Sequence, residues 1–224
     1  MIAVAHRGDW SEHRENTLEA FAAAVDGGAD MIELDVRRTA DGRAVVLHDA
    51  TLDRVWRVAR RVADLTRDEV VALGIPDFEQ ALAWIPPTVQ VMVDYKDEEV
   101  VEPALADVVA AGALDRAVFA GDCFPGHRRI RSLAPAARIA VTWDADEQIP
   151  DALLDELGAE FYNPSGNVLG RDPESVERMH ARGTLVSVWT IDERADMELL
   201  LDFGVDAIIT NRLATLVDLL GARC

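Results

Sequence analysis

Short apolar or alternating runs and segments of helical period follow one another along the whole chain of 224 residues. Runs of about 4–8 residues between turn signals indicate strands, and apolar positions three or four apart indicate helices. The expected strands cover residues 2–7, 31–36, 88–96, 117–121, 138–143, 160–164, 184–190 and 206–210. Helices are expected over 16–26, 98–111, 127–134, 151–157, 173–182, 194–203 and 213–220, with two pieces in 66–85. Eight strand–helix units favour a compact TIM (β/α)8 barrel in one domain, residues 1–224, over a doubly wound open sheet.

Residues 31–49 carry a separate hairpin signal, an Asp41-Gly42 pair between two alternating runs. Such a pair is typical of a two-residue β-hairpin turn. Because a link this short cannot be a parallel crossover, residues 44–49 are expected to return antiparallel. They would form an arm at the barrel mouth, outside the eight barrel strands. Pairing about a two-residue turn places Asp35 opposite His48, with Cβ atoms about 4.5–5.5 Å apart.

Polar side chains gather at the C-terminal ends of several expected strands, where a TIM barrel carries its active site. They are His6 and Arg7 on the first strand, Glu33 and Asp35 on the second, His48 on the arm, Asp94 and Lys96 on the third, and Trp189 as a wall on the seventh. Three carboxylates without cysteine partners favour Mg²⁺ or Ca²⁺ over zinc. Histidines can act as general acid and base, while arginine and lysine can hold a phosphate. The set predicts metal-assisted hydrolysis or transfer at phosphorus.

Each of these residues also has a purely structural interpretation. Glu33 and Asp35 can form salt bridges with nearby arginine or lysine, His48 can be a turn residue at a strand end, and Trp189 can be a packed wall. Co-occurrence at corresponding ends of three consecutive strands favours the catalytic interpretation over these.

Composition and charge narrow the class of partner. The net charge is −19, which disfavours binding to nucleic acid and to anionic membranes. No apolar run reaches the roughly 18 residues needed to span a bilayer, so stable membrane insertion is not expected. The N-terminus lacks the pattern of a secretory signal. Two cysteines, Cys123 and Cys224, form no metal-ligand spacing and no disulfide framework, so a reducing cytoplasm is expected.

Several motifs resemble those of the glycerophosphodiester phosphodiesterase family. They are HRG at 6–8, ENT at 15–17, GADMIELDV at 28–36, VVLHD at 45–49 and TLDR at 51–54, continued by DYK at 94–96, VWTID at 188–192 and GVDAIITNR at 204–212. The resemblance implies a TIM barrel, one divalent cation, and cleavage of a small glycerophosphodiester to glycerol 3-phosphate and an alcohol. It also implies an acid/base pair (His6, His48), metal ligands (Glu33, Asp35, Asp94) and phosphate contacts (Arg7, Lys96).

The chain departs from that family in three places. Asp94 stands where the family usually has Glu, and Asp192 stands where it usually has Asn. The segment after Arg54 is short, so we expect an open mouth without a sizeable inserted lid domain. Asp-x-Lys on the third strand also resembles lysophospholipase D and sphingomyelinase D enzymes, which is the second interpretation. A barrel that binds phosphorylated metabolites without turnover is a third, and the oligomeric state is left open.

Overall fold

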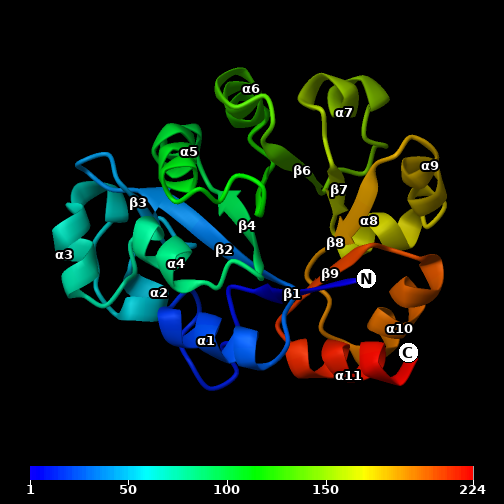
Figure 1. The fold of residues 1–224 in the computed structure, drawn as a ribbon, viewed down its shortest axis with the longest axis horizontal. Coiled ribbons are helices and arrows are strands. Elements are labelled where there is room, and N and C mark those ends of the chain that lie inside the picture. The colour runs from blue at the N-terminus through cyan, green and yellow to red at the C-terminus, as the bar shows by residue number, and fades with distance from the viewer. Residues whose placement is uncertain (224) are drawn as a thin grey trace.

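The computed structural model describes residues 1–223 and confirms the TIM barrel, which excludes the open sheet (Figure 1). Eight parallel strands form the barrel: β1 (Ile2–His6), β2 (Met31–Arg38), β4 (Gln90–Tyr95), β5 (Ala117–Gly121), β6 (Arg138–Trp143), β7 (Phe161–Pro164), β8 (Leu185–Val188) and β9 (Ala207–Thr210). β1 pairs with both β2 and β9, which closes the sheet. All eight correspond to predicted strands. Cys224 lies outside the described residues.

Helices surround the barrel (Figure 1). They are α1 (Leu18–Asp26), α2 (Asp53–Trp56), α3 (Arg67–Ala72), α4 (Phe78–Trp84), α5 (Val101–Ala110), α6 (Phe124–Leu133), α7 (Asp151–Leu157), α8 (Gly166–Arg171), α9 (Ser175–Ala181), α10 (Arg194–Phe203) and α11 (Leu213–Arg223), with 3₁₀ turns η1 (Val62–Asp64) and η2 (Glu98–Val100). Thr17 caps α1, and Thr66 with Glu69 forms a capping box on α3. No helix in residues 1–223 combines the length and apolarity needed to cross a bilayer.

Alternation along each strand sorts side chains between two cores. On β2, Ile32 and Leu34 face outward and pack in the large core between barrel and helices. Met31 faces inward and packs with Met92 of β4 inside the barrel. Because side chains alternate with period two, Glu33 and Asp35 continue the inward row toward the C-terminal mouth.

The hairpin after β2 forms, but its predicted register was wrong by one residue. β3 (Ala44–Val46) pairs antiparallel with β2, and the Thr39 N–H donates to the Arg43 carbonyl at 3.0 Å. This closes a three-residue loop in which Gly42 has a φ of +78°, the left-handed conformation that glycine adopts readily. Asp35 therefore faces Leu47, whose N–H donates to the Asp35 carbonyl at 3.0 Å, and does not face His48.

His48 reaches the barrel mouth from a bend that follows β3. The segment beyond it packs on a small core of its own under the arm. This core is formed by Val45, Leu47, Leu52, Val62, Leu65, Val70 and Ile75. The arm is thus anchored to the barrel rim, and the structure has no sizeable inserted lid domain within residues 1–223.

Candidate active site

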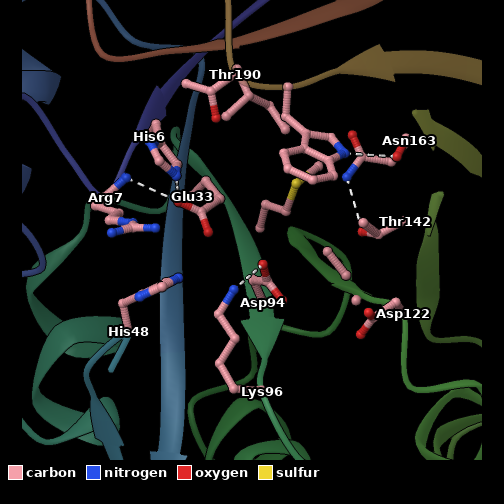
Figure 2. Close-up of a pocket in the computed structure, with 15 residues that line it drawn as sticks. His6, Arg7, Glu33, His48, Asp94, Lys96, Asp122, Thr142, Asn163 and Thr190 are labelled. Carbon is pink, nitrogen blue, oxygen red and sulfur yellow. Dashed lines mark hydrogen bonds and ion pairs between the residues drawn. The ribbon is translucent and has the colours of Figure 1, made fainter. Parts of the chain in front are cut away.

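A pocket of about 290 Å³ opens at the C-terminal mouth of the barrel (Figure 2). Seven of the eight predicted site residues line it: His6, Arg7, Glu33, His48, Asp94, Lys96 and Trp189. The eighth, Asp35, is fully buried and lies within ion-pair distance of Arg7 and Lys96. The structure therefore brings the whole predicted set together. β1, β2 and β4 are neighbours whose C-terminal ends coincide, while His48 reaches the same mouth after β3 and Trp189 after β8.

The three carboxylates form one cluster. Asp35 and Asp94 are directly paired across β2 and β4, and each of Glu33, Asp35 and Asp94 offers an oxygen within 4.8 Å of the others. Burial and the neighbouring charges of Asp35 and Asp94 raise the pKa of Glu33 well above its usual range. Burial also raises the pKa of Asp94 to about 6, against the opposing charge of Lys96. Burial alone would raise the pKa of Asp35, but Lys96 and Arg7 outweigh it and lower that pKa.

This cluster fits a hard divalent cation. Among residues 1–223, no donor reaches the buried Asp35 Oδ1 in hydrogen-bonding geometry, although Lys96 Nζ lies 2.9 Å away. Carboxylate oxygens are the ligands that Mg²⁺ and Ca²⁺ prefer. A cation would also relieve the repulsion that raises the pKa of Glu33, since it adds positive charge among the three carboxylates.

Arg7 and Lys96 supply the positive charge beside the cluster. Arg7 has a φ of +60°, and its backbone N–H donates to the Glu33 carbonyl at 2.9 Å and to Glu33 Oε2 at 3.0 Å. Lys96 Nζ bridges Asp35 Oδ1 at 2.9 Å and Asp94 Oδ2 at 2.7 Å. Asp35 therefore does form salt bridges, as the structural interpretation expects, but both of its partners, Arg7 and Lys96, also line the pocket.

The two histidines enter from different elements, and each has a partner at Nδ1. His6, at the end of β1, contacts Asn211 Oδ1 at 2.7 Å, and its Nε2 lies 4.0 Å from Glu33 Oε2. Burial, with the charge of Arg7, lowers the pKa of His6. His48 Nδ1 contacts Asp49 Oδ1 at 2.7 Å. Both side chains project toward the pocket in Figure 2.

The segment Glu15-Asn16-Thr17 ties these groups together. Glu15 accepts hydrogen bonds from Arg7 at 3.0 Å and from Arg54 at 2.9 and 2.6 Å, and Arg54 also holds Asp49 at 2.6 Å. Asn16, buried with a φ of +57°, donates from Nδ2 to Asp35 Oδ2 at 2.8 Å. The sequence marked this segment only as a family motif and a helix start, whereas its side chains contact Asp35 of the carboxylate cluster and the arginines that hold Asp49 beside His48 and border the cluster.

The opposite wall of the pocket was not predicted, apart from Trp189. It includes Asp122, Thr142 and Asn163, which follow or end β5, β6 and β7 (Figure 2). Asn163 Nδ2 donates to Thr142 Oγ1 at 3.1 Å, and the Trp189 indole N–H donates to the Asn163 carbonyl at 2.9 Å. The rule that barrel strand ends carry the site would have identified these positions, but only Asp122 among them carries a charge.

Known proteins match this chain over nearly its whole length. A profile of the Glycerophosphoryl diester phosphodiesterase family matches residues 6–215. A glycerophosphodiester phosphodiesterase from Caldanaerobacter subterraneus subsp. tengcongensis is 30% identical, with 97% of each chain covered. A probable glycerophosphodiester phosphodiesterase 2 from Mycobacterium tuberculosis is 34% identical over 99% of this chain and 91% of its own.

Solved structures share the fold. An Oleispira antarctica phosphodiesterase in complex with the product sn-glycerol-3-phosphate superposes with a TM-score of 0.90 at 19% identity, covering 99% of this chain and 97% of that one. A glycerophosphodiester phosphodiesterase from Parabacteroides distasonis gives a TM-score of 0.87 at 23% identity, covering 99% and 97%. The chain therefore belongs to the glycerophosphoryl diester phosphodiesterase family of enzymes.

Proposed function

We propose that this enzyme hydrolyses small glycerophosphodiesters to glycerol 3-phosphate and an alcohol, with one divalent cation, Mg²⁺ or Ca²⁺, held by Glu33, Asp35 and Asp94. The observation that carries the proposal is the cluster of three carboxylate oxygens within 4.8 Å, in the same pocket as two histidines and two cationic side chains. The names of the relatives support the substrate class. The structural neighbour that holds sn-glycerol-3-phosphate supports a glycerol phosphate product.

The bound cation would supply positive charge that polarises a phosphoryl oxygen. Arg7 and Lys96, which line the pocket next to Asp94 and Glu33, hold the phosphate by charge and hydrogen bonds. Trp189 forms the wall against which the substrate packs. These contacts orient the phosphorus between the two imidazoles, which is the contribution of positioning to the rate.

His6 and His48 move the protons. One imidazole accepts the proton of the attacking glycerol 2-hydroxyl, whose oxygen forms a bond to phosphorus. The other donates a proton to the alcohol oxygen as its bond to phosphorus breaks. Water then opens the resulting cyclic phosphate with the two histidine roles exchanged, which returns both side chains to their starting states.

Phosphorus NMR of a substrate panel tests the proposal. Glycerophosphocholine, glycerophosphoethanolamine, glycerophosphoinositol and lysophospholipids are each incubated with Mg²⁺, with Ca²⁺, or with EDTA. We expect glycerol 3-phosphate from the glycerophosphodiesters with a cation and no product in EDTA, with any cyclic phosphate visible as a separate resonance. Full turnover in EDTA contradicts the metal role. Product from lysophospholipids alone favours the lysophospholipase D alternative, and calorimetric binding without product favours a non-catalytic barrel.

A further inference from the structure

A group of hydrogen-bonded polar side chains lies behind His6, where the barrel closes between β1 and β9. Asn211, just after β9, contacts His6 Nδ1 through Oδ1 at 2.7 Å, and the Trp10 indole N–H donates to the same oxygen at 3.1 Å. On its other side, Asn211 Nδ2 donates to Asp192 Oδ2 at 2.8 Å. A chain of three side chains therefore leads from Asp192 to the proposed acid/base residue.

Asp192 is itself fixed by backbone and side-chain donors. Its Oδ1 accepts the Asn211 backbone N–H at 2.8 Å and the Thr210 hydroxyl at 3.1 Å. Thr210 is fully buried at the end of β9, which anchors the carboxylate to the barrel. Asp192 follows the Trp189-Thr190 segment after β8, so two neighbouring strand ends hold the carboxylate in place.

The chemistry of these groups permits one orientation of the Asn211 amide. An ionised carboxylate only accepts hydrogen bonds, and an indole N–H only donates them. The amide nitrogen of Asn211 must therefore face Asp192, and its oxygen must face Trp10 and His6. Because that oxygen is an acceptor, His6 Nδ1 has to carry a proton to make the contact at 2.7 Å. In the neutral imidazole, the lone pair is then on Nε2, the nitrogen on the Glu33 side at the pocket.

We propose that Asp192 and Asn211 are positioning residues that hold neutral His6 in its Nδ1–H tautomer, with the Nε2 lone pair directed into the pocket. The inference rests on the proposed acid/base role of His6 and adds the groups that make it ready to accept a proton. His48 has a matching arrangement in which the Asp49 carboxylate takes the contact at Nδ1. Both imidazoles thus offer Nε2 to the substrate, one backed by an amide and the other by a carboxylate.

A reciprocal exchange of the two side chains provides the sharpest test. Asn211→Ala removes the acceptor, and we expect kcat on glycerophosphocholine to fall about 10- to 100-fold with little change in KM. Asn211→Asp alone sets two carboxylates against each other and should also be impaired. The double variant Asp192→Asn/Asn211→Asp restores one donor amide and one acceptor carboxylate, so it should recover most of the lost kcat. Asn167→Ala, an exposed asparagine on α8, is the matched control for loss of an amide.

The tautomer is read directly by NMR. Protein labelled with ¹⁵N-histidine gives long-range ¹H–¹⁵N correlations that distinguish Nδ1–H from Nε2–H, and the His6 signals are assigned by their absence in His6→Gln. At pH 8 we expect Nδ1–H for wild type and for the double variant, and a mixture of tautomers for Asn211→Ala. An unchanged tautomer and unchanged kcat in Asn211→Ala overturn the inference, as does a double variant no better than Asn211→Asp alone.

The NMR result separates this inference from the proposed function. If wild type turns over none of the diesters, the proposed function fails. The His6 tautomer and its response to Asn211→Ala still decide whether Asp192 and Asn211 position His6. If wild type is active and the His6 tautomer does not change in Asn211→Ala, the positioning role of Asp192 and Asn211 fails and the phosphodiesterase proposal stands. Thermal unfolding of Asn211→Ala alongside Asn167→Ala shows whether a lost kcat reflects a lost fold.

Discussion

Replacing Glu33 with glutamine should make the metal-free protein more stable and abolish its response to divalent cations. Glu33 is 4% exposed and faces two carboxylates with oxygens within 4.8 Å. At that separation two full charges repel by about 3.5 kcal/mol at an effective dielectric constant of 20. Arg7 and Lys96 offset part of this. We therefore expect Glu33→Gln in EDTA at pH 8 to gain about 2 kcal/mol of unfolding free energy, which raises Tm by about 4–8 °C.

Adding a divalent cation should stabilise wild type and leave Glu33→Gln almost unchanged. A ligand at 100 times its Kd stabilises the folded state by about 2.7 kcal/mol, equivalent to a Tm increase of about 5–11 °C in a protein of this size. Wild type should show such an increase with Mg²⁺ or Ca²⁺ over EDTA. Glu33→Gln, which has lost one of three anionic ligands, should show almost none, although the glutamine oxygen can still accept the Arg7 N–H.

Differential scanning fluorimetry of both proteins in EDTA, Mg²⁺ and Ca²⁺ measures these shifts. Glu174→Gln makes the same change of charge at an exposed site and should behave as wild type in every condition. A Glu33→Gln variant that is less stable than wild type in EDTA, with an undiminished increase on adding cation, would refute the idea that this cluster is a cation site.

Two further changes test other parts of the site, and a third tests His127, a buried residue of α6 outside the pocket. His48→Ala should lower kcat by about 10²- to 10⁴-fold, the usual loss for a general acid or base, and an unchanged rate in the phosphorus NMR assay removes His48 from the mechanism. Arg54→Met removes the hydrogen bonds to Asp49 and Glu15 and should lower kcat about 10-fold, with no change in the Tm increase on adding cation. Loss of that Tm increase would mean that Arg54 supports the carboxylate cluster instead. Burial lowers the pKa of His127 from 6.5 to about 4, so the unfolded chain binds more protons between these values. The unfolding free energy should thus fall by up to about 3 kcal/mol from pH 6.5 to 4 in urea titrations, and His127→Leu should flatten that slope.

The barrel and its cluster of three carboxylates could be predicted because they depend on alternation within strands and on pairing between successive parallel strands. Period-two alternation placed Glu33 and Asp35 on the inward face of β2, and parallel pairing brought Asp94 beside Asp35. The hairpin register could not be fixed in the same way, because an Asp-Gly pair suits both two- and three-residue loops. Here the Thr39 hydroxyl contacts Asp41 at 2.6 Å and accepts the Arg43 N–H at 3.0 Å, which favours the longer loop.

Other features were missed for lack of a local signal. α2 and α8 have four and six residues, too few to show a helical period. The helix expected over 173–182 begins later than predicted, because α9 starts at Ser175 and the preceding Asp172 pairs with Arg178. Asn211 is uncharged and lies 205 positions from His6 in the sequence. Its role depends on closure of the barrel between β1 and β9, which no sequence window contains.

The acidic composition of the chain and the anionic substrate proposed for it can be reconciled within the pocket. The net charge of −19 is spread over the surface, and charges beyond about 8 Å are largely screened at physiological ionic strength. The electrostatic potential at a bound phosphodiester is therefore determined mainly by the charges in the pocket. At full ionisation the three clustered carboxylates and Asp122 on the opposite wall outnumber Arg7 and Lys96, which leaves two negative charges. One divalent cation at the proposed site would cancel both charges, so we expect it to help admit the anionic substrate as well as to activate it.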